Sequence, residues 1–351
     1  MRAWLTLSAI IGSDNVTTRT LMPTPSSLLR ALTLAGAVLL ASGGASLAAA
    51  QTGYPTKPVR IVVPFPPGGP ADALARIVGD KLAQSLGQPF VIENKPGAGG
   101  NIGMEQGAKA APDGYTLTLA AAGNLTIAPS LYSKLPYDPA KDYAPISVLA
   151  TVPNILITAP TVPGKTLRDL ITLAKARPGT LNFASPGNGS GAHLAGELFK
   201  SMAGIEIVHV PFNGVGPAMN ALLAGDVQMF FAQSSAALPY IKTGKVTALG
   251  VAGTKRLASA PELPTLAEAG LPDFEVTSWY ALVAPAGTPP AIIDRLNAET
   301  VKALASPDVR ERLATLGVEP VGNSPSEFAA MQKSETSRWA KLAKEANLRL
   351  D

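Results

Sequence analysis

Three segments of the chain place glycines and small polar residues between an apolar run and a helix-like run. They are residues 65–72, 120–126 and 185–191. At such a junction the bare N–H groups that begin a helix bind anions without a cationic side chain, and glycine lets a ligand approach the backbone closely. These segments therefore favour the binding of a carboxylate, although each alone is also typical of an ordinary tight turn.

The expected contacts with the ligand lie in these three segments. They are Phe65, Pro67, Gly68, Gly69, Ala71 and Asp72 in the first segment, Ala122 and Asn124 in the second, and Ser185, Gly187, Gly189 and Ser190 in the third. We expect one ligand carboxylate on the amides of 68–71 and a second charged or polar group on those of 187–190. Asp72 and Ser190 are also expected to cap the helices that follow.

The same residues do not form a catalytic motif. Residues 187–192 are similar to the dinucleotide-binding pattern G-x-G-x-x-G, but their glycine spacing ends one residue early. The sequence contains no phosphate-binding P-loop, and Asn188 stands where a nucleophile elbow needs glycine. Because the chain has no cysteine, disulfides, thiolate catalysis and Cys-ligated metals are excluded.

His193 and His209 are the only two histidines of the chain. His193 and Glu197 share one helical face at i, i+4, but a metal site needs more ligands than this pair. His193 is expected either to line the ligand cleft or to cap the helix, whereas His209 is expected to pack within an apolar strand. We expect no catalytic residue, no metal site and no cofactor.

The first fifty residues are typical of an export signal. Arg30 is followed by a short apolar run and then by small residues that end in three alanines at 48–50. The run is shorter than the roughly 20 residues that span a bilayer. We therefore expect a cleaved secretory signal and a periplasmic protein, with a retained membrane anchor as the alternative. Translation begins at Met1 or at Met22.

The composition is that of a globular protein of about two domains, with 351 residues, 46% of them hydrophobic and 15% charged. Three arginines and one aspartate lie in the leader, so removing it lowers the formal charge from +4 to +2. This charge does not indicate nucleic-acid binding. We expect a monomer that binds a small molecule.

Beyond residue 50, extended apolar runs alternate with helix-period segments, which predicts an α/β fold with mainly parallel strands. Strands are expected at 59–65, 90–92, 116–120, 155–157, 181–184, 207–212, 227–231 and 246–251. Helices are expected from Asp72 and at 167–176, 190–202, 217–223, 292–305, 308–316 and 325–346. The predicted division is a leader at 1–50, lobe 1 at 51–153 with 278–351, and lobe 2 at 154–277, with the terminal helices packed on lobe 1.

Five stretches of the mature sequence resemble the Bug/TctC substrate-binding proteins of tripartite tricarboxylate transporters. They are 54–69, 94–103, 112–116, 185–194 and 261–270, which include YPTKPVRIVVPFPPGG, NKPGAGGNIG and PELPTLAEAG. The resemblance covers most of the mature chain. It implies a two-lobed type II periplasmic binding protein fold with the ligand cleft between the lobes, and a ligand held by backbone amides and ordered water.

The resemblance also places contacts at His193, Asn213 and Ala232, and the chain departs from the family at two of these. Asn213 stands where many members have lysine, and Ala232 stands where many have aspartate, as does Gln228. Because an ammonium would lack a carboxylate partner, we expect unaminated di- or tricarboxylates or aromatic acids to bind better than amino acids.

The predicted function is the capture of a small carboxylate for a membrane permease of the tripartite type. Two alternatives remain at this point. The first is an accessory protein that reports the ligand to a sensor, and the second is an enzyme that processes a carboxylate or ester.

Overall fold

The computed structural model describes residues 53–345 and 349. The expected leader at 1–50, its cleavage site and the choice of starting methionine lie outside these residues. The account below concerns the compact unit that begins at Tyr54. None of the helices in the described part of the chain is both long and apolar enough to cross a membrane.

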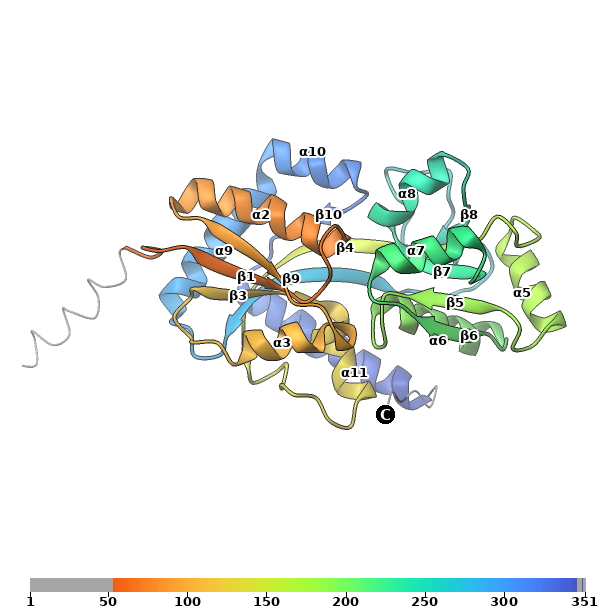
Figure 1. Ribbon diagram of the computed structural model, residues 1–351, viewed down its shortest axis with the longest axis horizontal. Helices are drawn as coiled ribbons and strands as arrows, with labels where there is room; N and C mark the ends of the chain where they lie inside the picture. The colour runs from red at the N-terminus through yellow and green to blue at the C-terminus, as the bar shows by residue number, and fades with distance from the viewer. Residues whose placement is uncertain (1–52, 346–348, 350–351) are drawn as a thin grey trace, which may run out of the picture. The chain divides into compact units, whose positions relative to one another are not determined.

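Strands and helices alternate through most of this unit (Figure 1). The strands are β1 Val59–Val63, β2 Phe90–Asn94, β3 Thr116–Ala121, β4 Tyr143–Thr158, β5 Asn182–Ser185, β6 Val208–Pro211, β7 Met229–Gln233, β8 Thr247–Val251, β9 Thr277–Pro285 and β10 Glu319–Pro320. The helices are α2 Pro70–Leu86, α3 Asn101–Ala108, α4 Ala128–Leu131, α5 Leu167–Ala176, α6 Gly191–Ala203, α7 Val215–Ala224, α8 Ser234–Lys242, α9 Pro290–Ala305, α10 Pro307–Thr315 and α11 Pro325–Glu345. Two short helical turns complete the set, η1 Ala98–Gly100 and the π-helical η2 Gly123–Ile127.

The strands form two parallel groups joined by antiparallel strands, in the order β2-β1-β3-β9-β4-β7-β5-β6. In the first group β1 pairs in parallel with β2 and β3, and in the second β5 pairs in parallel with β6 and β7. Every pairing of β4 and β9 is antiparallel. The prediction of mainly parallel strands is therefore wrong for the centre of the molecule, where the chain crosses between the lobes.

β4 passes through both strand groups without interruption. Its first part pairs with β9, while Asn154–Thr158 pairs with β7. Its register shifts against β9 after Pro145 and Val148, and against β8 between Leu156 and Ile157. This α/β architecture has two lobes, here named lobe 1 for the group around β1 and lobe 2 for the group around β5. The predicted division at 153/154 and 277/278 stays a prediction.

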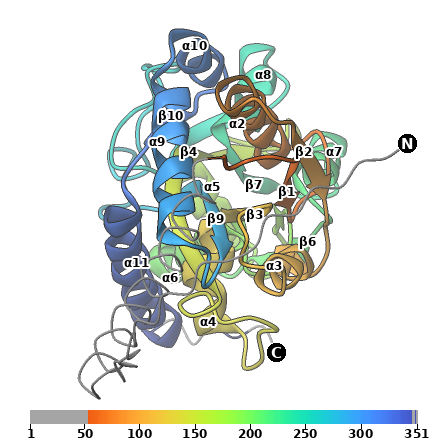
Figure 2. The same ribbon diagram turned by 90° about the vertical axis from the view of Figure 1, so that its left-hand side faces the viewer.

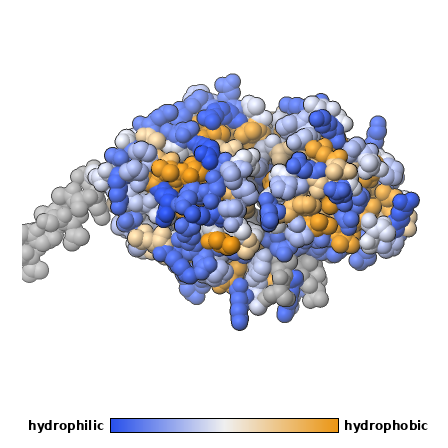
Figure 3. All heavy atoms as spheres, viewed as in Figure 1, coloured by the Kyte–Doolittle hydropathy of each residue, from blue (hydrophilic) through white to orange (hydrophobic). Residues whose placement is uncertain are grey.

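Each lobe has its own apolar core because its strands are covered by the apolar faces of helices. In lobe 1, Val59, Ile61 and Val63 of β1 pack with buried side chains of α2, α9 and α10. In lobe 2, Phe183 of β5 and Phe231 of β7 pack with buried side chains of α5 to α8. Outside these cores, hydrophilic and hydrophobic side chains are mixed over the face drawn in Figure 3.

The three C-terminal helices do not all pack on lobe 1. α9 and α10 do, through Leu296 and Leu313 in the lobe 1 core. α11 lies across both lobes, since Phe328 packs beside Trp279 of β9, whereas Trp339 belongs to the lobe 2 core. Figure 2 shows α11 on the side of the sheet away from α2. α9 and α10 therefore pack on the lobe 1 core, whereas the end of α11 packs on the lobe 2 core.

Candidate functional site

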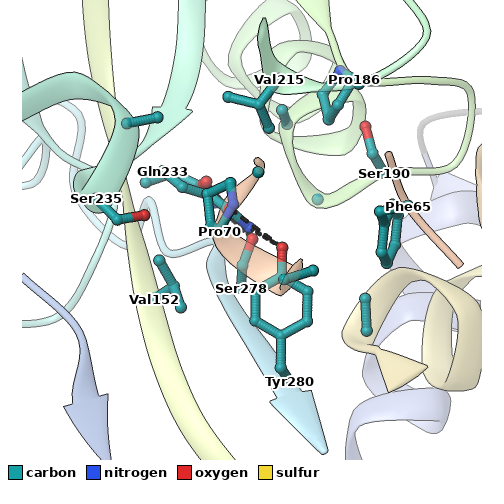
Figure 4. A pocket seen from close by; sticks show the side chains of 18 of the residues that line it. Phe65, Pro70, Val152, Pro186, Ser190, Val215, Gln233, Ser235, Ser278 and Tyr280 are labelled. Carbon is teal, nitrogen blue, oxygen red and sulfur yellow. Dashed lines mark hydrogen bonds between the residues drawn. The ribbon is translucent and has the colours of Figure 1, made fainter. Parts of the chain in front are cut away.

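A cavity of about 490 Å³ lies where the loops of both lobes meet the crossing strands. The loops that follow β1, β3, β5 and β7 all contribute to its wall, as expected for a ligand site at the carboxyl ends of parallel strands. Figure 4 shows Phe65 and Ser190 together at one end and Ser235 and Val152 at the other. The hydrogen-bonded pair Gln233 and Tyr280 lies between these ends. The cavity is therefore elongated and is built by both lobes.

The lobe 1 loop is held by a charged network behind it. α2 begins at Pro70 with Gly69 as its N-cap, so the prediction that Asp72 is the N-cap is wrong. Proline is favoured in the first turn because its fixed φ suits a helix start. The Asp72 carboxylate instead accepts a hydrogen bond from Gly68 N–H at 2.9 Å and pairs with Arg76 at 2.9 Å. Asn94 Nδ2 donates to both Asp72 and the Phe65 carbonyl.

This network keeps Asp72 ionised although its side chain is buried. Burial alone raises the pKa of the carboxyl, but hydrogen bonds from Arg76, Gly68 and Asn94 outweigh it and hold the pKa below its usual value. Arg76 neutralises the negative charge at the start of α2. The amides of Gly69 and Ala71, which line the cavity, are therefore available to an anion.

The second loop runs from Ala122 into the π-helical turn η2, and both Ala122 and Asn124 line the cavity. Asn124 Nδ2 donates to the Gly99 carbonyl at 3.0 Å, while Asn124 Oδ1 is buried with no partner among the described residues. This loop carries no charged side chain. It adds backbone dipoles and a carboxamide to the wall.

The lobe 2 loop is held by neutral groups. Ser190 is the N-cap of α6, as predicted, and its Oγ accepts a hydrogen bond from His193 N–H at 3.3 Å. Gly189 N–H donates to Nδ1 of His193 at 3.2 Å. Ser185 Oγ donates to the Gly187 carbonyl and also accepts from Gly187 N–H. The first amides of α6, at Gly191 and Ala192, line the cavity and have no partner within the helix.

The two histidines form a stack directly behind this loop. Their rings are 3.8 Å apart between centroids, and His209 also stacks on Phe183 at 4.9 Å. His209 Nε2 lies 2.7 Å from Ser185 Oγ. Burial is the main reason that the pKa of His193 falls to about 3 and that of His209 to about 4, so both rings are neutral near pH 7. A neutral His193 is required because its Nδ1 accepts the hydrogen bond from Gly189.

The floor of the cavity comes from the crossing strands and contains polar side chains that were not predicted. Gln233 Nε2 donates to Tyr280 Oη at 2.7 Å, and Asn154 Nδ2 donates to Ser278 Oγ at 3.2 Å. Burial raises the pKa of Tyr280 to about 12, so it stays a neutral hydrogen-bonding group. Asn154 and Gln233 are polar residues beside apolar runs, which is a signal that could have identified them. Tyr280 gives no such signal because, in the sequence, it lies within an apolar run and is typical of a core residue.

The predicted contacts divide into two sets. Those that line the cavity are Phe65, Pro67, Gly68, Gly69, Ala71, Ala122, Asn124, Gly189 and Ser190. Those that lie behind or beside its wall are Asp72, Ser185, Gly187, His193, Asn213 and Ala232. Whether any of them binds ligand stays a prediction.

None of the described residues that line the cavity carries a formal charge. The wall consists of backbone amides at helix starts, neutral polar side chains, and aromatic rings that include Phe65 and Tyr280. Among the described residues, no three His, Asp or Glu side chains come close enough together to hold a metal ion. Such a cavity can stabilise an anion through oriented dipoles and can also pack against an apolar surface.

The lobes touch each other beside the cavity through backbone atoms. A Cβ added to Gly123 of lobe 1 would lie 2.7 Å from the Gly189 carbonyl oxygen of lobe 2, and one added to Gly99 would lie 2.4 Å from the Asn188 carbonyl oxygen. We call this contact the glycine seam. Because these glycines have no side chain, the backbones of the two lobes approach each other more closely than any other residue would allow.

Comparison with known proteins gives consistent matches over most of the chain. Residues 74–348 match the model of the tripartite tricarboxylate transporter family receptor, TctC. Protein BugT of Bordetella pertussis is 39% identical over 325 residues, which cover 92% of this chain and 99% of BugT.

Two solved structures show the same fold. R. palustris Rpa4515 with adipate has a TM-score of 0.82 at 38% identity and covers 85% of this chain and 100% of its own. MatC from Rhodopseudomonas palustris with bound malate has a TM-score of 0.78 at 38% identity and covers 82% of this chain and 99% of its own. The expected type II periplasmic binding fold is therefore confirmed, and the chain belongs to the TctC family of tripartite tricarboxylate transporter receptors.

Proposed function

We propose that this protein captures a small carboxylate in the cleft between its lobes and delivers it to a membrane permease of the tripartite type. The observation that carries the proposal is a cavity without charged side chains into which the starts of α2 and α6 face from opposite lobes. Helix starts stabilise negative charge through their dipoles and free amides. The relatives whose structures contain adipate and malate support the same class of ligand.

We further propose that the ligand is unaminated. One carboxylate would dock on the amides of Gly69 and Ala71, and a second charged or polar group on those of Gly191 and Ala192. The expected ranges 68–71 and 187–190 are narrowed in this way because the N–H groups of Gly68, Gly187, Gly189 and Ser190 already have partners within the protein. An amino acid would bring an ammonium into a cavity whose described lining contains no carboxylate, and desolvating an unpaired charge costs several kcal/mol. Ala232 lies fully buried in β7 and offers no partner for an ammonium.

The proposed role is binding without catalysis, in the periplasm, by a monomer. Among the described residues that line the cavity there is no histidine, aspartate or glutamate to act as a general base, and the two histidines behind its wall are weak bases because burial lowers their pKa values. Relatives described as a periplasmic transporter and a periplasmic binding protein support the location. Turnover of a carboxylate or ester by the purified protein at enzyme-like rates, lost in Ser190→Ala, would contradict this role.

Calorimetry with a panel of ligands tests the proposal. Succinate, citrate, terephthalate and nicotinate are compared with aspartate and glutamate, and at least one unaminated acid should bind more tightly than either amino acid. Tighter binding of aspartate or glutamate than of every unaminated acid would contradict the ligand preference.

A pair of variants at Gly189 tests whether the lobe 2 loop belongs to the site. Gly189 has a φ of +74°, a conformation that Asn and Asp adopt more readily than most residues. Gly189→Asp adds a negative charge, and Gly189→Asn adds the same volume without charge. We expect Asp to weaken carboxylate binding at least tenfold relative to Asn, whereas equal binding by the two variants would remove this loop from the site.

A further inference from the structure

The cavity extends beyond the loops that offer amides. Beyond those loops, its wall is made by the first two turns of α2, α7 and α8 and by the residue that follows α10. We call this part the annex, and its lining residues are Leu74, Met219, Ala236, Pro239, Tyr240 and Leu316. All six are uncharged, and five of them present only apolar side chains. The annex therefore differs in chemistry from the end that holds Phe65 and Ser190.

The annex lies between the lobes on the side of α8 and α10. Ser234 Oγ, at the start of α8, donates to the Gly317 carbonyl just after α10 at 2.7 Å. Leu74 and Leu316 pack with the lobe 1 core, whereas Met219, Ala236 and Tyr240 pack with the lobe 2 core. Figures 1 and 2 both show α8 and α10 on the side of the crossing strands away from α3. Neither lobe's core fills this space, so a ligand can bring its own apolar surface into it.

One unpartnered polar group marks the approach to the annex. Ser235 lines the cavity at the end away from Ser190 (Figure 4), and its Oγ is buried without a partner among the described residues. A buried hydroxyl without a partner is destabilising by itself, which favours a ligand atom that completes its hydrogen bond. The rest of the annex offers contact area but little polarity.

We propose that the annex takes the apolar body of the ligand, so that the protein selects carboxylates carrying an aromatic or aliphatic group over short diacids. This inference rests on the proposed function, because the glycine-rich loops must hold the carboxylate. The cavity volume of about 490 Å³ is within the range of pockets for drug-sized ligands and exceeds what a four-carbon diacid needs. Each buried methylene strengthens binding by about fourfold, so a phenyl ring in the annex should dominate the selectivity.

The test uses two matched pairs of ligands that differ only by a phenyl group. Calorimetry compares propionate with 3-phenylpropionate, and succinate with 2-phenylsuccinate, on the mature chain. We expect the phenyl member of at least one pair to bind ten times more tightly or better. Ala236 is half-buried in the annex wall, and Ala236→Phe should abolish this gain, measured as the ratio of the two affinities within each pair.

Ala314→Phe is the matched control because Ala314 is exposed on α10 and lies outside the cavity lining. It should keep the phenyl gain in full. If Ala236→Phe does not fold, the smaller Ala236→Leu serves in its place. The inference is overturned if the phenyl acids bind no better than the unsubstituted acids, or if the Ala236 variant keeps the gain. Failure of every tested carboxylate to bind would instead overturn the proposed function.

Discussion

In lobe 1 the loop that faces the cavity is held by charged groups, whereas in lobe 2 the corresponding loop is held by neutral ones. Asp72, Arg76 and Asn94 form the first support, and the stacked His193 and His209 form the second. Both supports hold a glycine N–H behind the wall, that of Gly68 in one lobe and of Gly189 in the other. The difference shows that backbone amides can be positioned for one purpose by an ion pair or by uncharged rings. The two solutions should respond differently to mutation and to pH.

The largest effect of a single substitution is expected from removing the carboxylate of the lobe 1 support. Asp72→Ala leaves Gly68 N–H, Arg76 and Asn94 without their shared partner, and we expect a loss of about 3 kcal/mol in the free energy of unfolding. Urea denaturation at pH 7 measures it. Asp72→Asn is the control and should lose less, because the amide oxygen can still accept from Gly68. A loss below about 0.5 kcal/mol in Asp72→Ala would show that the network contributes little.

The histidine stack should make the protein less stable in acid. The pKa values of His193 and His209 fall from 6.5 to about 3 and about 4 on folding, so the unfolded chain binds protons that the folded chain excludes. Their stabilising effect is therefore complete above pH 6.5 and is lost as the pH falls through the window below it. Between pH 7 and pH 5 we expect a loss of about 2 kcal/mol per histidine.

Denaturation curves at pH 7 and pH 5 check this prediction. His209→Phe keeps an aromatic ring against Phe183 but cannot titrate, and it should reduce the difference between the two pH values by about half. The neighbouring ion pair of Lys200 and Glu197 stays in place in this variant. An unchanged pH dependence would mean that the acid sensitivity arises elsewhere.

A smaller effect, on ligand affinity, is expected at the glycine seam where the two lobes touch. Gly123→Ala places a methyl group against the Gly189 carbonyl at the glycine seam and should hold the lobes apart. We expect the ligand affinity measured by calorimetry to fall about tenfold, or about 1.4 kcal/mol. Gly216→Ala is the matched control, because Gly216 also lines the cavity but its added Cβ meets no atom within 4 Å. Equal affinities in the two variants would show that closure does not depend on the seam.

The smallest effect concerns the cap of α6. Ser190→Ala removes the acceptor for His193 N–H, and loss of such a cap costs about 1 kcal/mol. Thermal unfolding without ligand measures this cost. Lobe 1 has no matching side-chain cap, since Gly69 stands at the N-cap of α2, so Gly69→Ser should have no comparable destabilising effect. A larger loss of stability in Gly69→Ser than in Ser190→Ala would contradict the assignment of the side-chain cap to α6.

Much of the fold could be predicted from local periodicity. The helix expected at 167–176 has those bounds, because Leu167, Leu170 and Ala174 recur on one buried face and Thr166 with Asp169 forms a capping box. The strand at 59–65 was predicted two residues too long, since the chain turns after Val63. The greater part of β4 was not predicted, because residues 143–154 contain two prolines and interrupted apolar runs. Its long strand depends on pairing with β9 and β7, which are distant in the sequence.

The candidate site could be predicted where it consists of backbone and could not where it consists of side chains brought together by the fold. The glycines at 68, 69 and 189 mark loops that any reading of the sequence can identify, and all three line the cavity. Gln233 and Tyr280 are 47 positions apart, so only the pairing of β4 with both β7 and β9 brings them into contact. Asp72 was assigned to the wrong role because a carboxylate in the first turn of a helix can cap it or can tie back the preceding loop.

The unbroken path of β4 through both strand groups has a mechanical consequence. A connection that bends at a single residue would let one lobe rotate freely against the other. In β4, any rotation must be shared as twist among many hydrogen-bonded residues. We expect most of this twist at the register shifts near Pro145, Val148 and Leu156, because the strand pairing is irregular there. We therefore expect the resistance to rotation of the lobes to grow with the angle through which they turn.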